Sequence, residues 1–327
     1  MKRLLLAAAL AVLAPLTVAA QTPSRDVLLT SNGELYTIES VFTEDVEGLD
    51  AAATSVLQLR VDGGEQLQSM IVPASTSAGV SGSPALAYDS ASKTLFVFWE
   101  HRRNNGLATD LLFASYHDGA WSPAATITGA DLHVCSNLRV LATRSGGQLT
   151  VHTTWWEDSG RSESAKYAML TIQNGAVANI AVRDLEELAR DVRVDGGQPS
   201  SDDLLRHPIL LAGASSDEVD AIFGSTNDGA LRRISIRIVE DGFIRIPGGI
   251  RGGPIGHPSV RVGSTSRPDA IALPGSGHIA FYVTTGDRID YATFDGTSWS
   301  ATHALPLGAR LTQEAAVNAL RRMLANE

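Results

Sequence analysis

Cysteine is almost absent from this chain, since Cys135 is the only one among 327 residues. A single thiol cannot form an internal disulfide, so folding must depend on the core alone. About 300 residues are enough to bury a large core without disulfides. Cys135 lies near the start of a predicted strand, where we expect a buried and unreactive thiol.

Positive charge is also scarce. The 26 Lys and Arg residues are outnumbered by 36 Asp and Glu residues, which gives a formal net charge of −10 at pH 7. Proteins bind nucleic acids and anionic membrane surfaces through basic patches. This balance therefore argues against nucleic acid and anionic lipid as partners.

No apolar run is long enough for a stable membrane span. The longest, residues 4–16, follows Lys2 and Arg3 and precedes a small-residue cleavage site at 18–20. This pattern predicts a secretory signal peptide over residues 1–20. We expect the mature protein to be exported, periplasmic or secreted, without membrane insertion.

Familiar catalytic and metal-binding motifs are missing as well. No Gly-x-Ser-x-Gly elbow and no Ser/His/Asp arrangement is visible. His207 and His257 could join Glu157 or Asp158 in a metal site, but no close spacing of His, Asp and Glu supports one. We predict no metal and no other cofactor.

Short strand-like segments separated by turn residues fill the rest of the chain. Residues 94–100 are rich in aromatic and β-branched side chains, and Asp118-Gly119 is a strong hairpin signal. Four strands are expected in this stretch, at 84–88, 94–100, 110–116 and 121–128. Four consecutive antiparallel strands in about fifty residues are typical of one β-propeller blade.

The hairpin turn recurs at nearly regular spacing. Asp-Gly or Asn-Gly pairs stand at 62–63, 118–119, 174–175, 241–242 and 295–296, which are 56, 56, 67 and 54 residues apart. Such a repeat predicts a propeller. We predict an all-β fold, a β-propeller of about five four-stranded blades over residues 21–308. A two-sheet sandwich also has many short strands, but it would not repeat in this way.

The other blades and the chain end complete this prediction. Residues 309–327 are expected to form a short helix that covers an edge of the last blade, with Thr312 as N-cap and Val317, Leu320 and Leu324 on one face. The remaining strands are expected at 27–30, 34–43, 55–61, 66–72, 138–143, 148–157, 166–172, 177–182, 209–212, 219–223, 231–239, 243–246, 270–273, 278–284, 289–294 and 299–305.

Propeller topology predicts which loops share a face. Loops between the second and third strands of a blade emerge beside the blade-to-blade connections, and the Asp-Gly hairpins lie opposite. The mixture of Arg, His and acidic groups in the loops of the blade-junction face suits a polar ligand, although an ordinary solvated surface would look similar. Trp99 and Trp156 could stack on sugars, but we expect them to pack between blades. The candidate ligand-binding residues on the blade-junction face are His101, Arg102, Arg103, Glu157, Asp158, His207, Arg251 and His257.

Two hairpins resemble turns of a known family. Residues 116–122 (Tyr-His-Asp-Gly-Ala-Trp-Ser) and 294–300 (Phe-Asp-Gly-Thr-Ser-Trp-Ser) resemble the Asp-box turns of sialidase-like β-propellers, which join the last two strands of a blade. Residues 245–247 (Arg-Ile-Pro) are similar to the element that carries a substrate-binding arginine in sialidases. Asp boxes are structural turns remote from the active site, so the resemblance implies the fold rather than catalysis.

Three functional hypotheses follow. The first is an exported, non-catalytic propeller that binds a glycan, an anion or a protein through the blade-junction face. The second is a sialidase-like glycoside hydrolase, which would need channel-facing carboxylates with perturbed pKa values. The third is a scaffold that acts only through protein contacts and would carry an apolar patch. We favour the first hypothesis.

Overall fold

The computed structural model describes most of the chain between residues 25 and 306. The predicted signal peptide and C-terminal helix lie outside the described residues, so both stay predictions. Within the described part, no helix is long and apolar enough to cross a membrane. The described stretches are 25–30, 34–49, 52–62, 67–103, 109–129, 134–158, 163–173, 176–185, 209–212, 217–224, 231–238, 244–245, 268–272, 279–285, 288–294, 300–301 and 303–306.

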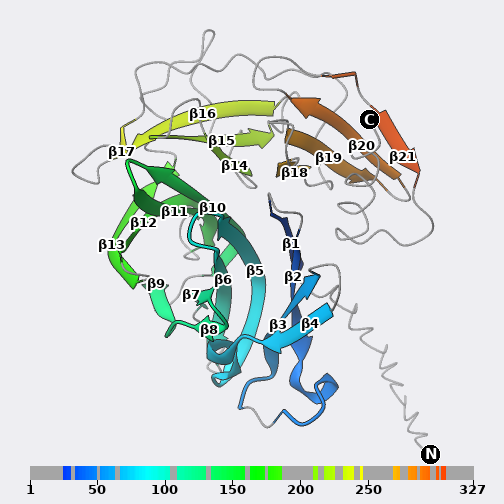
Figure 1. The fold of residues 1–327 in the computed structure, drawn as a ribbon, viewed down its shortest axis with the longest axis vertical. Coiled ribbons are helices and arrows are strands. Elements are labelled where there is room, and N and C mark those ends of the chain that lie inside the picture. The colour runs from blue at the N-terminus through cyan, green and yellow to red at the C-terminus, as the bar shows by residue number, and fades with distance from the viewer. Residues whose placement is uncertain are drawn as a thin grey trace, which may run out of the picture.

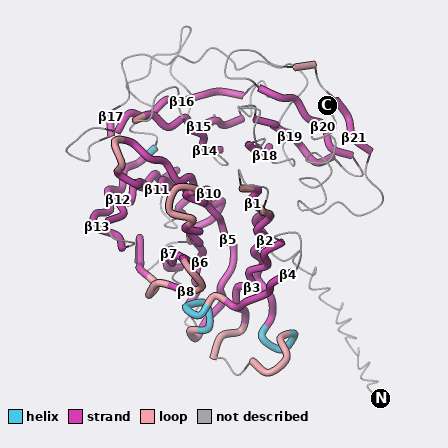
Figure 2. Tube along the Cα trace, viewed as in Figure 1, coloured by secondary structure: helices cyan, strands magenta, loops and turns pink. Residues whose placement is uncertain are grey.

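The fold is all-β, and its strands form consecutive antiparallel meanders (Figure 1, Figure 2). The first meander contains β1 (Arg25–Leu29), β2 (Leu35–Phe42), β3 (Ser55–Asp62) and β4 (Leu67–Ile71). The second contains β5 (Gly79–Asp89), β6 (Thr94–Arg103), β7 (Thr109–His117) and a fourth strand in two pieces, β8 (Ala120–Trp121) and β9 (Ala125–Gly129). Short 3-10 helices η1 (Thr43–Asp45) and η2 (Pro73–Thr76) lie in the connections.

Three further meanders follow the same order. The third contains β10 (Val134–Ser145), β11 (Gln148–Asp158), β12 (Glu163–Gln173) and β13 (Ala176–Asp184). The fourth contains β14 (Ile209–Ala212), β15 (Glu218–Gly224), β16 (Leu231–Ile238) and β17 (Ile244–Arg245). The fifth contains β18 (Pro268–Ala272), β19 (Ile279–Thr285), β20 (Arg288–Phe294) and β21 (His303–Pro306).

The first strands of the meanders are neighbours in space. Contacts join β1 to β5, β5 to β10, β10 to β14 and β1 to β18, so strands far apart in the sequence meet near the middle of the molecule (Figure 1). A single parallel bridge between Ser55 and Val80 links the first two meanders into one nine-stranded sheet, while each later meander is a separate four-stranded sheet.

The two hairpins that resemble Asp boxes share a hydrogen-bonding pattern. The hydroxyl of Ser122 accepts a bond from the backbone N–H of Ser115 at 2.9 Å, and the hydroxyl of Ser300 accepts one from the N–H of Thr293 at 2.9 Å. In the first hairpin, Asp118 and Gly119 have positive φ angles of 47° and 79°, as the predicted Asp-Gly turn requires. The serine is thus a structural part of the turn.

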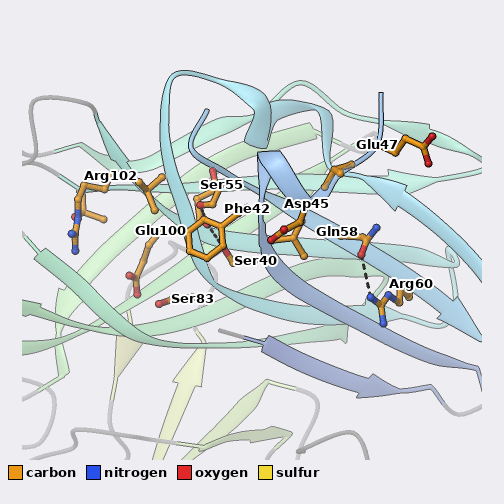
Figure 3. Close-up of a pocket in the computed structure, with 16 residues that line it drawn as sticks. Ser40, Phe42, Asp45, Glu47, Ser55, Gln58, Arg60, Ser83, Glu100 and Arg102 are labelled. Atoms are coloured by element: carbon orange, nitrogen blue, oxygen red, sulfur yellow. Dashed lines mark hydrogen bonds between the residues drawn. The ribbon is translucent and has the colours of Figure 1, made fainter. Parts of the chain in front are cut away.

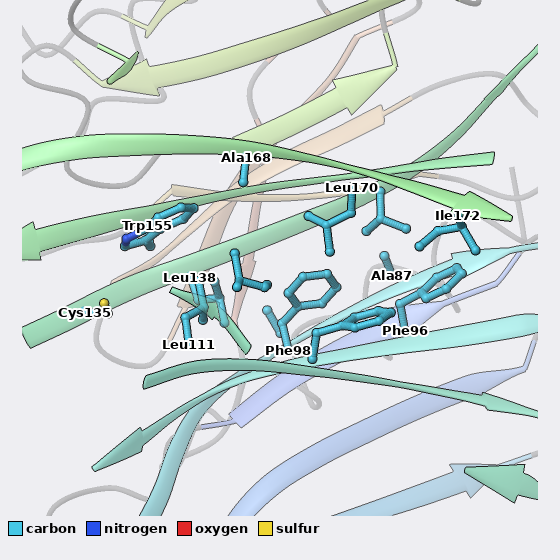
Figure 4. Packing of buried hydrophobic residues seen from close by; sticks show 14 of the residues in the cluster. Ala87, Phe96, Phe98, Leu111, Cys135, Leu138, Trp155, Ala168, Leu170 and Ile172 are labelled. Atoms are coloured by element: carbon cyan, nitrogen blue, oxygen red, sulfur yellow. The ribbon is translucent and has the colours of Figure 1, made fainter. Parts of the chain in front are cut away.

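The core lies between neighbouring meanders. Figure 4 shows Phe96, Phe98 and Leu111 of the second meander beside Trp155 and Leu170 of the third. Trp99 and Trp156 are 0% and 9% exposed, which confirms the prediction that they pack in the core rather than stack on a ligand. Cys135 is also buried, as predicted.

His152 lies in the core with its polar atoms satisfied. Its Nε2 atom is 2.8 Å from the hydroxyl of Thr143, and its Nδ1 atom is 2.6 Å from the hydroxyl of Tyr167. The side chain is 0% exposed. Burial lowers the pKa of His152 to about 3, so it is neutral at physiological pH.

This burial predicts a loss of stability in mild acid. An unfolded histidine takes up a proton as the pH falls below about 6.5, whereas folded His152 does not until about pH 3. Its contribution is therefore fully present above about pH 6.5 and falls by up to about 1.4 kcal/mol per pH unit below that value. Urea unfolding of wild type and His152→Gln, each at several pH values, would measure the difference. The half-exposed His117, changed to Ala, is the control; an equal pH slope in wild type and His152→Gln would contradict the expectation.

Candidate functional site

A cleft of about 880 Å³ lies where the first and second meanders meet, at the ends of strands β2, β3, β5 and β6. It is on the same side as the connections between meanders and opposite the Asp118-Gly119 hairpin, because β6 ends where β5 begins and the hairpin follows β7. Its lining mixes two guanidinium groups, carboxylates, hydroxyls and an exposed aromatic ring (Figure 3). We call this the junction cleft.

Serine side chains hold the two meanders together at the cleft. The hydroxyls of Ser40 and Ser55 donate to the backbone carbonyl of Ser81 at 2.6 and 2.9 Å. The hydroxyl of Ser81 in turn donates to the carbonyl of Ser75 at 3.2 Å. Because Ser40 and Ser55 belong to the first meander and Ser81 to the second, these bonds fix the relative position of the walls.

His101 supports the cleft and is 5% exposed. Its Nδ1 atom lies 3.1 Å from the Ser81 hydroxyl. The Ser81 hydroxyl thus joins Nδ1 of His101 to the carbonyl of Ser75. This Ser/His pair is buried, so it positions β5 against β6 and is not placed to attack a substrate.

Gly79 allows the close approach of these two strands. Its φ angle is +143°, and a Cβ atom at this position would lie 2.3 Å from the carbonyl oxygen of Arg102 and 2.9 Å from the ring of His101. Any side chain larger than hydrogen would push the strands apart. Gly79 therefore shapes the cleft without lining it.

Arg102 is the arginine that stays available. Its side chain is exposed, lines the junction cleft and makes no hydrogen bond or ion pair with any described residue. Arg103, by contrast, is held by Asp110 through two bonds of 2.7 and 2.5 Å. Arg60, the other arginine of the cleft, is bound to the buried Glu39 at 2.5 Å. Arg102 is thus the group best placed to donate to a ligand.

Phe42 adds an aromatic surface that sequence reasoning missed. It is 57% exposed, and in the view of Figure 3 its ring lies between Arg102 on one side and Arg60 on the other. Val80, 42% exposed, lines the same cleft. Phe42 ends a predicted strand, and nothing in the sequence distinguishes it from a core phenylalanine.

Glu157 lies at the end of β11, and its Oε2 atom accepts a bond from the indole N–H of Trp155 at 3.3 Å. The pKa of Cys135 is raised to about 12, mainly by burial and also by the negative charges of Glu157, Glu100 and Asp110. Glu100, which contributes to this shift, lines the junction cleft.

The remaining predicted site residues are only partly placed. Asp158 follows Glu157 at the end of β11, opposite Val134 in the sheet. His207, Arg251 and His257 lie outside the described residues, so their roles stay predictions. Within the described stretches, no three His, Cys, Asp or Glu side chains group closely enough to hold a metal ion.

No known protein-family model matches the sequence, and no curated protein is detectably similar to it. Solved structures do match. An α-L-arabinanase of Penicillium chrysogenum, complexed with arabinobiose, has a TM-score of 0.51 at 13% identity over 91% of this chain and 86% of that one. The GH93 α-L-arabinofuranosidase of Fusarium graminearum, also with arabinobiose, has a TM-score of 0.52 at 11% identity over 88% and 82%.

The chain has a β-propeller fold like that of these two enzymes. This confirms the resemblance of the two hairpins at the level of fold. A Hadza microbial sialidase, Hz136, matches 88% of this chain at 13% identity with a TM-score of 0.49, and this chain spans 58% of its length. At these identities the matches describe architecture alone.

Proposed function

We propose that this chain is an exported, five-bladed β-propeller that binds a glycan in the junction cleft. Residues 1–20 would direct export, each meander would be one blade, and residues 309–327 would cover the last blade. The contacts between β1 and β18 and among the first strands β1, β5, β10 and β14 support a ring of five blades.

Phe42 is the observation that carries this proposal. An apolar ring 57% exposed in a polar cleft gains stability when a flat apolar surface covers it. The C–H face of a sugar ring is such a surface, and sugar hydroxyls can pair with nearby polar side chains. Arg102 lies in the same cleft, and so does Gln58, whose Oε1 atom already accepts a bond from Arg60 at 3.2 Å. The guanidinium of Arg102 would also donate hydrogen bonds to a carboxylate or another anionic substituent on the sugar.

A glycoside hydrolase is the second candidate. Glu100, which lines the junction cleft, and Glu157, from the neighbouring meander, both raise the pKa of Cys135. Most glycoside hydrolases use a pair of carboxyl groups. No described arrangement yet assigns an acid and a base, and we favour binding without catalysis.

Isothermal titration of the full chain would test the binding proposal. Arabinotetraose, galactotetraose and sialyllactose are suitable probes, with thermal shift as a second readout, since a ligand at a hundredfold excess over Kd stabilises by about 2.7 kcal/mol. We expect Phe42→Ala to weaken binding by up to about tenfold, in line with the energy of an aromatic contact. Arg102→Ala should weaken binding about fivefold or more, because a charged donor is lost.

Exposed positions away from the cleft provide the controls. Val182→Ala and Arg183→Ala should leave the affinity unchanged. Equal weakening by all four substitutions, or no binding of any probe, would rule out the junction cleft as a glycan site. Release of monosaccharide that depends on both Glu100 and Glu157 would favour the hydrolase instead.

A further inference from the structure

A second cleft lies at the opposite end of the second meander, between it and the third. Its volume is about 810 Å³, close to that of the junction cleft. It is bounded by the turn before β6, the Asp118-Gly119 hairpin region and the turn between β10 and β11. Its lining includes Ser115, His117, Trp121, Arg144, Gln148 and Gln173. We call this the hairpin cleft.

The positive charge of Arg144 in the hairpin cleft is neutralised within the protein. Arg144 donates to both carboxylate oxygens of Asp89, at 2.6 to 3.0 Å, and its remaining Nη1 atom donates to the carbonyl of Gly147. His117 lies 3.1 Å from a carboxylate oxygen of Asp118. An anionic ligand would have to compete with these carboxylates, so the cleft favours an uncharged one.

Three uncharged polar groups of the cleft have no hydrogen-bond partner among the described residues. The hydroxyl of Ser115 and the amide of Gln173 make no hydrogen bond with any described residue, although both side chains line the cleft. The indole N–H of Trp121 is likewise without a partner in the described part of the chain. The position of the indole is set by Tyr116, whose ring centroid lies 5.0 Å away.

We propose that the hairpin cleft is a second binding site and that its ligand is a neutral oligosaccharide. The indole of Trp121 offers a fixed, partly exposed stacking surface, and Ser115 and Gln173 offer donors and acceptors for sugar hydroxyls. Because Arg144 is paired with Asp89, this cleft differs in its available charge from the junction cleft, where the Arg102 side chain has no partner among the described residues. The proposal does not depend on ligand binding in the junction cleft.

Tryptophan fluorescence of the full chain provides a direct test. Trp99, Trp155 and Trp156 are 0%, 2% and 9% exposed, whereas Trp121 is half-buried at the cleft. The probes are arabinotetraose, cellotetraose and galactotetraose, with tetragalacturonate as the acidic counterpart of the last. We expect a saturable fluorescence change with at least one neutral tetrasaccharide, and weaker binding of tetragalacturonate than of galactotetraose.

Substitutions locate the site. Trp121→Phe should keep binding by calorimetry but lose the fluorescence change, and Trp121→Ala should weaken binding about tenfold. Ser115→Ala and Gln173→Ala should each weaken it about fivefold, the value of one hydrogen bond. Phe42→Ala, in the junction cleft, should leave this affinity unchanged.

Gln173 is exposed, so its variant is expected to fold even if a change at Trp121 disturbs the hairpin. Failure of all three neutral probes to bind would overturn the proposal. So would tighter binding of tetragalacturonate than galactotetraose, or a neutral sugar whose affinity is lowered by Phe42→Ala and not by Gln173→Ala.

Discussion

Replacing Phe98 with Ala is expected to lower the free energy of unfolding by about 3–5 kcal/mol. The side chain is 0% exposed, and its ring centroid lies 4.9 Å from that of Phe113. It belongs to the cluster that joins the second and third meanders, so its removal leaves a cavity between two sheets (Figure 4). Urea unfolding followed by circular dichroism would measure the loss.

Phe42→Ala is the matched control, because it removes the same side chain from a position that is 57% exposed. Exposed substitutions away from packed features usually change stability by about 0.5 kcal/mol or less. Phe98→Ala is thus expected to lower the stability, whereas Phe42→Ala is expected to lower the affinity for the ligand. A similar loss of stability for both variants would show that Phe42 is packed more tightly than the structure has it.

Asp89→Ala is expected to cost about 1.5–3 kcal/mol, because it removes charge-assisted hydrogen bonds between a buried carboxylate and a guanidinium that is 34% exposed. The Asp89 side chain is 7% exposed and binds Arg144 of the next meander, as well as the backbone N–H of Ser92 at 2.9 Å. Removing it leaves Arg144 without its carboxylate and removes one of the links between the two sheets. Thermal and urea unfolding would measure the cost.

The pH dependence of this contribution has a definite sign. Burial by itself would raise the pKa of Asp89, but hydrogen bonds from Arg144 and Ser92 outweigh burial and lower it to about 2. Because the folded pKa is below the unfolded one, the stabilisation is present above about pH 3.8 and is lost as the pH falls towards about 2. The pair of Lys166 and Asp184 is the control, because its carboxylate is 33% exposed against 7% for Asp89, and Asp184→Ala should cost about 1 kcal/mol or less. Equal costs at the two sites would refute the expected dependence on burial.

Strand positions were predictable because alternation and turn chemistry are local. The strand expected at 209–212 is β14 (Ile209–Ala212), and the one expected at 289–294 is β20 (Arg288–Phe294). The errors lie at strand ends. Residues 94–100 were expected as a strand, but β6 continues to Arg103, since pairing with β5 extends to Gly79. Such pairing partners are distant in the sequence, and local pattern does not contain them.

The site was harder to predict for the same reason. Placing His101, Arg102 and Arg103 in a loop was wrong, because all three lie in β6 and their environments differ. His101 is buried beside Ser81, Arg102 lines the junction cleft, and Arg103 pairs with Asp110. Residue type alone marked all three as equivalent. Only the fold distinguishes a structural histidine from an available arginine.

Cys135 makes the chain a convenient object for chemical labelling. The thiol is 1% exposed, and its pKa of about 12 leaves almost none of it as reactive thiolate at neutral pH. A cysteine introduced at the rim of either cleft could therefore carry a spectroscopic probe while the thiol of Cys135 stays unmodified in the folded protein. Once the second and third meanders separate, Cys135 becomes reactive, so its rate of modification would report how often that boundary opens.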